Sequence, residues 1–169
     1  MQSGSQSPQS LSDLQGIHQE LEALFYLHQV ALLKSDYSSA KALLKEYEEN
    51  LLMHMKEEED ILLPLYRDRA EPVRGGDAET FTGEHKKIVE WLNRLRLRLF
   101  RVTPVSPDLR AVIALWDDEA SFKKCVEHHA LREDRIFYPE IERLVTEEEK
   151  KHLLRLMTFN LEQKPVVRP

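Results

Sequence analysis

Two stretches of the sequence, 54-HMKEEEDILLP-64 and 129-HALREDRIFYP-139, share one pattern. In each, a histidine is followed four residues later by a glutamate and six residues after that by a proline. The pattern consists of His54, Glu58 and Pro64 in the first stretch and His129, Glu133 and Pro139 in the second. A histidine and a glutamate four apart on a helix project from the same face. The sequence therefore contains an internal repeat with two polar, metal-ligating residue types on one helix face.

The apolar residues around these stretches recur at spacings of three and four, which is typical of amphipathic helices. We expect four long helices, over about residues 11–33, 39–67, 78–101 and 107–144, with a kink at Pro64. Ser106 is expected to cap the fourth helix, with Pro107 at its first position. Thr146 and Glu149 form a capping box for a short fifth helix ending near Met157. Short breaks between long helices predict an all-α fold, an antiparallel up-down-up-down four-helix bundle with a short C-terminal fifth helix.

Composition limits the classes of function. The 30 acidic and 24 basic residues give a net charge of −6, which argues against a nucleic-acid-binding surface. Neither a signal peptide nor a membrane-spanning run is apparent, so we expect a cytoplasmic protein without membrane association. Residues 1–10 are expected to be disordered, residues 11–158 to form one domain, and residues 159–169 to be a frayed tail.

The first and third helices each add a histidine at the level of the repeated pattern. His18 and His54 both lie 18 residues from a chain reversal at Asp36. His85 and His129 both lie 22 residues from Pro107. One layer of the bundle should therefore hold the six candidate metal ligands His18, His54, Glu58, His85, His129 and Glu133.

Four imidazoles and two carboxylates are the donors that a dinuclear metal site needs. The carboxylates can bridge two cations and neutralise their charge, while the imidazoles complete each coordination sphere. Such nitrogen and oxygen donors suit iron, manganese or zinc, and a site with open positions in a helical bundle favours iron. A single histidine on an apolar face is usually a packed core residue, but the repeat of histidine with glutamate favours metal binding.

Over about Leu11–Leu144 the sequence resembles the hemerythrin-like, or HHE cation-binding, domain. The resemblance rests on His18, both repeated stretches and the segment 84-EHKKI-88. It implies two non-haem iron ions joined by carboxylates and an oxo or hydroxo bridge, with manganese or zinc as possible substitutes. It also implies that dioxygen, or a related small molecule, binds at an open iron position. The six ligand places of the family fall on the six residues named above.

The sequence departs from oxygen-carrying hemerythrins at one place. Those proteins have two histidines four apart on the third helix, whereas the neighbours four residues from His85 are Phe81 and Val89. The chain thus resembles a four-histidine branch, which weakens simple reversible oxygen carriage. We expect a non-enzymatic protein that binds or senses dioxygen. The alternatives are a di-iron enzyme acting on peroxide or nitric oxide, and an iron-responsive or iron-donating module.

Several further polar residues have a structural interpretation. His28 is expected to be structural, His128 to face solvent or support the site, and His152 to lie on the surface. Glu22 is expected to form a boundary salt bridge and Cys125 to pack in the core, although both lie near the candidate ligands. The acidic run is expected to be a solvated face, and three tyrosines are possible hydrogen-bond donors to the site. These residues are Glu57, Glu59 and Asp60 in the run, and Tyr26, Tyr47 and Tyr138.

Overall fold

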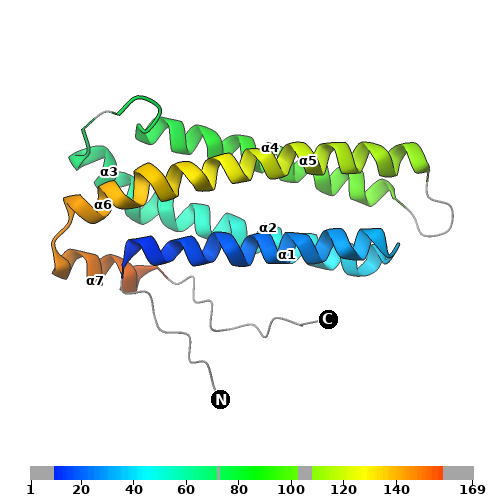
Figure 1. Cartoon of the computed structure of the whole chain (residues 1–169), viewed down its shortest axis with the longest axis horizontal. Coiled ribbons are helices and arrows are strands. Elements are labelled where there is room, and N and C mark those ends of the chain that lie inside the picture. Colours follow the sequence, from blue (N-terminus) through cyan, green and yellow to red (C-terminus); the bar gives the residue numbers. More distant parts are fainter. Residues whose placement is uncertain (1–9, 72, 103–107, 158–169) are drawn as a thin grey trace, which may run out of the picture.

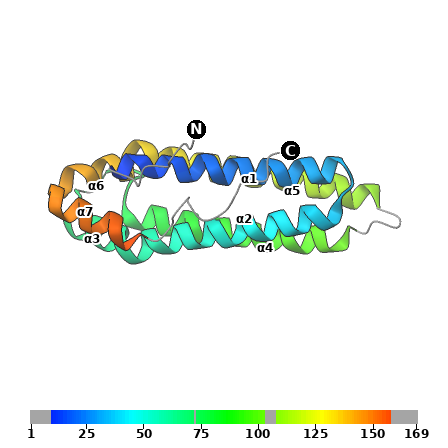
Figure 2. The ribbon, with the colours of Figure 1, turned by 90° about the horizontal axis from the view of Figure 1, so that it is seen from below.

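The structure is a computed structural model that describes residues 10–71, 73–102 and 108–157. Four long helical segments lie side by side and alternate in direction (Figures 1 and 2). They are α1 (Gln15–Leu33) after a 3-10 turn η1 (Leu11–Leu14); α2 (Tyr37–Glu57) with η2 (Glu58–Leu62) and α3 (Leu63–Arg69); α4 (Ala78–Arg101); and α5 (Leu109–Arg132) with η3 (Glu133–Phe137) and α6 (Tyr138–Leu144). The short fifth helix is α7 (Glu147–Leu156). The described residues contain no strand, and the predicted all-α bundle is confirmed.

Local sequence signals set most helix starts. The Asp36 side chain accepts from the Ser39 amide at the start of α2, and Asp77 accepts from the Thr80 amide at the start of α4. The predicted capping box of Thr146 is present at α7. The predicted start of the fourth helix was wrong, because α5 begins at Leu109 with Asp108 as its cap. Ser106 and Pro107 lie outside the described residues, as do the predicted disordered segment up to residue 9 and the tail from residue 158.

The interruption near each repeated proline is a π turn rather than a simple kink. In η2 the Leu63 amide donates to the Glu58 carbonyl, five residues back, and in η3 the Tyr138 amide donates to the Glu133 carbonyl. A proline lacks an amide hydrogen and its ring crowds the carbonyl four residues earlier, so the helix widens before it. Single π turns occur frequently at functional sites in helices. Both copies of the repeat thus place their glutamate at the first residue of a π turn.

The core runs along the bundle and encloses the polar layer predicted from sequence. About two helical turns from this layer, on one side, three aromatic rings pack together with centroids 5.0 to 5.9 Å apart. These are the rings of Phe25, Tyr47 and Phe122. On the other side, Phe81 and Phe137 pack at 4.7 Å and Tyr66 joins them. All six rings are at most 3% exposed. The polar layer is therefore packed between two layers of buried aromatic rings.

The fifth helix covers the end of the bundle nearest this layer (Figure 2). Arg69 Nη2 of α3 lies 2.8 Å from Glu149 Oε1, and Lys150 Nζ lies 2.5 Å from Glu142 Oε1 of α6. Helix α7 also packs against η2, which holds Glu58. None of the helices described here is long and apolar enough to cross a membrane.

Candidate metal centre

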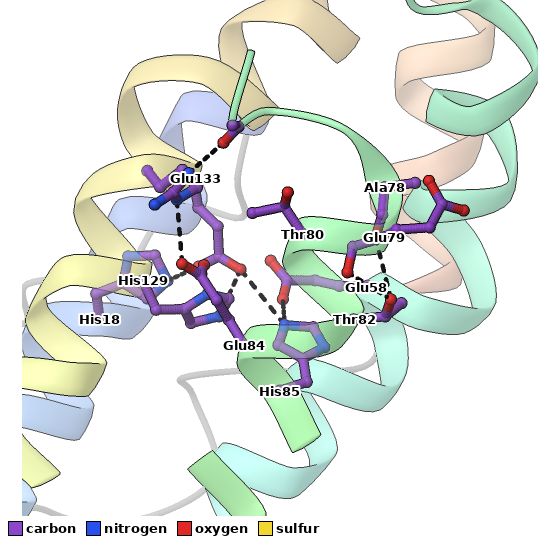
Figure 3. Close-up of polar contacts among 12 residues, drawn as sticks. His18, Glu58, Ala78, Glu79, Thr80, Thr82, Glu84, His85, His129 and Glu133 are labelled. Atoms are coloured by element: carbon purple, nitrogen blue, oxygen red, sulfur yellow. Dashed lines mark hydrogen bonds and ion pairs between the residues drawn. The ribbon is translucent and has the colours of Figure 1, made fainter. Parts of the chain in front are cut away.

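The six side chains predicted as ligands meet inside the bundle. Each helical segment contributes: His18 from α1, His54 and Glu58 from the α2–η2 junction, His85 from α4, and His129 and Glu133 from the α5–η3 junction. Five of them are at most 3% exposed, while the His18 side chain is 14% exposed. Figure 3 shows His18, Glu58, His85, His129 and Glu133 directed toward one another.

Glu133 lies between two pairs of histidines. Its Oε1 is 2.8 Å from His129 Nε2 and 3.6 Å from His85 Nε2, whereas its Oε2 is 3.1 Å from His18 Nε2. The His18 and His54 Nε2 atoms are themselves 3.1 Å apart. One carboxylate thus faces both pairs of histidines, each with a separate oxygen.

Glu58 faces the same two pairs from the opposite helix. Its Oε2 is 3.4 Å from His85 Nε2 and its Oε1 is 3.7 Å from His54 Nε2. Two groups of possible ligands result, and in each the donor atoms lie within 4.8 Å of one another. The first comprises Glu58, His85, His129 and Glu133, and the second comprises His18, His54 and Glu133. The described residues therefore form two adjacent groups of side chains that could each hold a metal ion, and Glu133 belongs to both groups.

Buried atoms without a hydrogen bond indicate that this cluster fits metal ions. Glu58 Oε2, both Glu133 oxygens, His85 Nε2 and His129 Nε2 are fully buried and make no hydrogen bond of acceptable geometry. Buried polar atoms are nearly always satisfied, and leaving carboxylates unsatisfied is costly. Cations between these atoms would satisfy all of them at once with donors that transition metals prefer.

The electrostatics of the cluster show how protons compete with cations. Burial alone lowers the pKa of His18, but its contacts with Asp134 and Glu133 outweigh burial and raise the pKa to about 10. Burial also lowers the pKa of His85, but its contacts with Glu133 and Glu58 outweigh burial and raise the pKa to about 10. The pKa of Glu133 is held well below its usual value because the surrounding imidazoles outweigh its burial. A metal ion bound here would have to displace these imidazole protons, so its binding would depend on pH.

A second set of carboxylates holds the outer nitrogens of the histidines. His85 Nδ1 lies 2.9 Å from Glu59 Oε1, and His18 Nδ1 lies 3.3 Å from Asp134 Oδ1. Each of these acids directly follows a glutamate of the repeat, so the two contacts are related by the repeat. The hydrogen bond between His85 Nδ1 and Glu59 fixes the tautomer of that imidazole and directs its Nε2 into the cluster, whereas His18 Nδ1 and Asp134 Oδ1 form an ion pair without a hydrogen bond. The prediction of a solvated face was wrong for Glu57, which is buried, whereas Glu59 and Asp60 are exposed as expected, and Glu59 contacts His85 from its exposed position.

A third acid supports His129. Its Nδ1 lies 3.0 Å from Glu84 Oε2, and Glu84 Oε1 lies 3.1 Å from Arg132 Nε. The Arg132 guanidinium also donates to the carbonyl of Gly75 in the loop before α4. Gly75 has a φ of +71°, a conformation that glycine adopts without strain. The loop backbone, Arg132 and Glu84 thus form one chain of contacts that ends on a candidate ligand.

Among the three candidate tyrosines, the structure brings Tyr138 to the site. Its hydroxyl donates to Glu58 Oε1 at 2.5 Å and lies 3.5 Å from His18 Nε2. Burial raises the Tyr138 pKa well above its usual value, so the phenol keeps its proton. Tyr26 is exposed, and Tyr47 belongs to the aromatic layer.

The remaining polar candidates lie outside the cluster. His28 is fully buried, with Nδ1 2.7 Å from the Ala40 carbonyl and Nε2 2.9 Å from Glu119 Oε1. The predicted structural role fits these contacts. His128, His152 and Glu22 are exposed, and Cys125 is half-buried against the core.

Comparison with known families agrees with the fold and the cluster. Residues 10–141 match the family model described as the hemerythrin HHE cation binding domain. The match covers well over half of the chain, and the chain belongs to this family. Searches of curated proteins and of solved structures gave no significant match. The chain is therefore a member of a cation-binding family with a buried cluster of histidines and glutamates that could hold metal.

Proposed function

We propose that this protein holds two non-haem iron ions in the cluster and binds or senses dioxygen or a related small molecule there. The observation that carries the proposal is the pair of adjacent donor groups that share Glu133. The proposed ligands are His18, His54, Glu58, His85, His129 and Glu133. Imidazole with carboxylate is a donor set that suits iron, with manganese or zinc as substitutes.

Each group of residues around the cluster would have a distinct role. Iron supplies redox chemistry and an open coordination position for a small molecule. The aromatic layers would pack on both sides of the cluster, and Glu59, Glu84 and Asp134 would hold the imidazoles in place. Tyr138 keeps a protonated hydroxyl beside Glu58, so it can donate a hydrogen bond inside the buried part of the cluster.

The test is anaerobic reconstitution with ferrous iron, followed by metal analysis and optical spectra before and after admission of dioxygen. We expect two iron ions per chain and a visible band that appears with dioxygen and disappears when it is removed. His129→Ala should lose most of the iron, and His128→Ala, a change at the exposed neighbouring histidine, should not. Iron binding without any spectral response to dioxygen would refute the dioxygen function.

A di-iron enzyme that acts on peroxide is the second candidate. The observation that favours it is the Tyr138 hydroxyl, a protic group 3.5 Å from His18 Nε2. The two candidates differ in turnover. Repeated consumption of added peroxide by the iron-loaded protein, abolished in His129→Ala, would favour the enzyme over the carrier or sensor.

A further inference from the structure

The two halves of the cluster are related by the internal repeat but are not equivalent. A shift of 75 residues carries His54 onto His129 and Glu58 onto Glu133. The same shift carries Leu63 onto Tyr138, so only one half of the repeat supplies a hydroxyl. Both side chains at this position are fully buried, Leu63 at 1% and Tyr138 at 0% exposure.

The hydroxyl of Tyr138 forms a hydrogen bond with one of the two carboxylate oxygens of Glu58. It donates to Glu58 Oε1, the oxygen that faces His54, and leaves Glu58 Oε2 toward His85. Leu63 can make no such contact with Glu133, and both Glu133 oxygens are without a hydrogen bond. The His85–His129 pair therefore has two carboxylates available, while the His18–His54 pair has only Glu133.

The surroundings add to this difference. Glu59 and Glu84 hold the Nδ1 atoms of His85 and His129 at 2.9 and 3.0 Å, and both imidazoles are 3% exposed. The Asp134 contact with His18 is longer, at 3.3 Å, and the His18 side chain is 14% exposed. The position beside His18 is thus held less tightly and lies nearer to solvent.

We propose that the cluster is graded: one cation is bound first and tightly by His85, His129, Glu58 and Glu133, and the second is exchangeable, bound by His18, His54 and Glu133. Tyr138 sets this grading because its hydrogen bond competes with the second cation for Glu58 Oε1. The inference rests on the proposed function, since it requires that the cluster binds two cations. It adds an order of loading and a positioning residue that determines it.

The first test uses Co²⁺ titration of the metal-depleted full chain, followed by visible absorption and by metal analysis after gel filtration. We expect two binding steps whose dissociation constants differ about 10- to 100-fold, the range that loss of a supporting ligand contact typically costs. Two ions bound with equal affinity would overturn the grading but leave the proposed function intact. Failure to bind two cations would refute both.

The repeat offers a matched pair of variants, His18→Ala and His85→Ala. We expect His18→Ala to retain one Co²⁺ at the tight dissociation constant of the unmodified protein. His85→Ala should retain at most one ion, with a dissociation constant raised at least tenfold. Equal retention by the two variants would contradict the graded site. Far-ultraviolet circular dichroism checks that both variants fold.

Tyr138→Phe tests the cause of the grading without removing a proposed ligand. It deletes the hydroxyl and keeps the buried ring, so Glu58 Oε1 becomes available to the second cation. We expect the second dissociation constant to fall at least tenfold and the two steps to approach each other. Tyr47→Phe, in the aromatic layer, is the control and should leave both steps unchanged. An unchanged gap in Tyr138→Phe would show that Tyr138 does not set the order.

Discussion

The shared position of Glu133 makes its replacement the most informative single perturbation. Glu133→Gln keeps the size of the side chain but removes the charge that faces His18, His85 and His129. Removing one charged partner from a buried ion pair typically costs about 3–5 kcal/mol, and we take this cost as the free energy of cation binding that is lost. At about 1.4 kcal/mol per factor of ten, the affinity for each cation should fall by about two to three and a half orders of magnitude. Both ions are affected because Glu133 belongs to both donor groups.

The loss can be measured as a change in thermal stabilisation. A metal at one hundred times its dissociation constant stabilises a folded protein by about 2.7 kcal/mol, which corresponds to about 5–11 °C in Tm for a domain of this size. We expect the unmodified protein to show such a shift on ferrous iron loading, and Glu133→Gln to show almost none at the same iron concentration. Glu127→Gln, at an exposed position of the same helix, makes the same charge change and should behave as the unmodified protein. A full Tm shift with two bound ions in Glu133→Gln would refute the shared-ligand reasoning.

Three further predictions follow from the surroundings of the cluster. Metal-depleted protein should lose stability as pH rises from about 6.5 to about 10. His18 and His85 have a pKa of about 10 in the folded protein and near 6.5 in the unfolded chain, so their stabilising protons are lost across that pH range. A Tm that is equal at pH 6.5 and pH 9.5 would contradict this prediction. Glu84→Gln should weaken metal binding about 10- to 100-fold, because a neutral amide orients the His129 imidazole less firmly; unchanged dissociation constants in a metal titration would count against it. Glu119→Ala should destabilise the fold by about 3–5 kcal/mol in urea unfolding, because it leaves buried His28 without its carboxylate, yet it should retain two iron ions; loss of iron would show that this pair belongs to the site.

The sequence allowed the fold and the layer of candidate ligands to be predicted because both depend on local spacing. His54 and Glu58 share a face since they are four residues apart, and the equal distances from Asp36 bring His18 level with His54. Capping at Thr146 was predictable for the same reason, since the box lies within four residues.

The contacts between helices could not be predicted in this way. Whether the exposed Glu59 side chain also reaches His85 depends on the rotation of one helix against another, which periodicity leaves open by a fraction of a turn. A π turn changes that rotation, and the prolines indicated an interruption without its form. The adjacency of Glu59 to Glu58, and of Asp134 to Glu133, was a signal that could have suggested these supporting acids.

Selection of Tyr138 among the tyrosines had the same obstacle. Tyr138 lies five residues after Glu133 in the same helical segment, yet its hydroxyl donates to Glu58 in a different segment. The comparison of the two repeats, tyrosine against leucine at equivalent positions, marks this difference in the sequence. Its consequence for the site required the three-dimensional arrangement.

The most direct test of the central claim is a crystal structure of the anaerobically iron-reconstituted protein, with anomalous scattering measured at the iron absorption edge. We predict two adjacent anomalous peaks inside the bundle, one beside His85 and His129 and one beside His18 and His54, with Glu133 between them. A protein that contains iron but shows no peak in this layer, or a single peak elsewhere on the chain, would contradict the account.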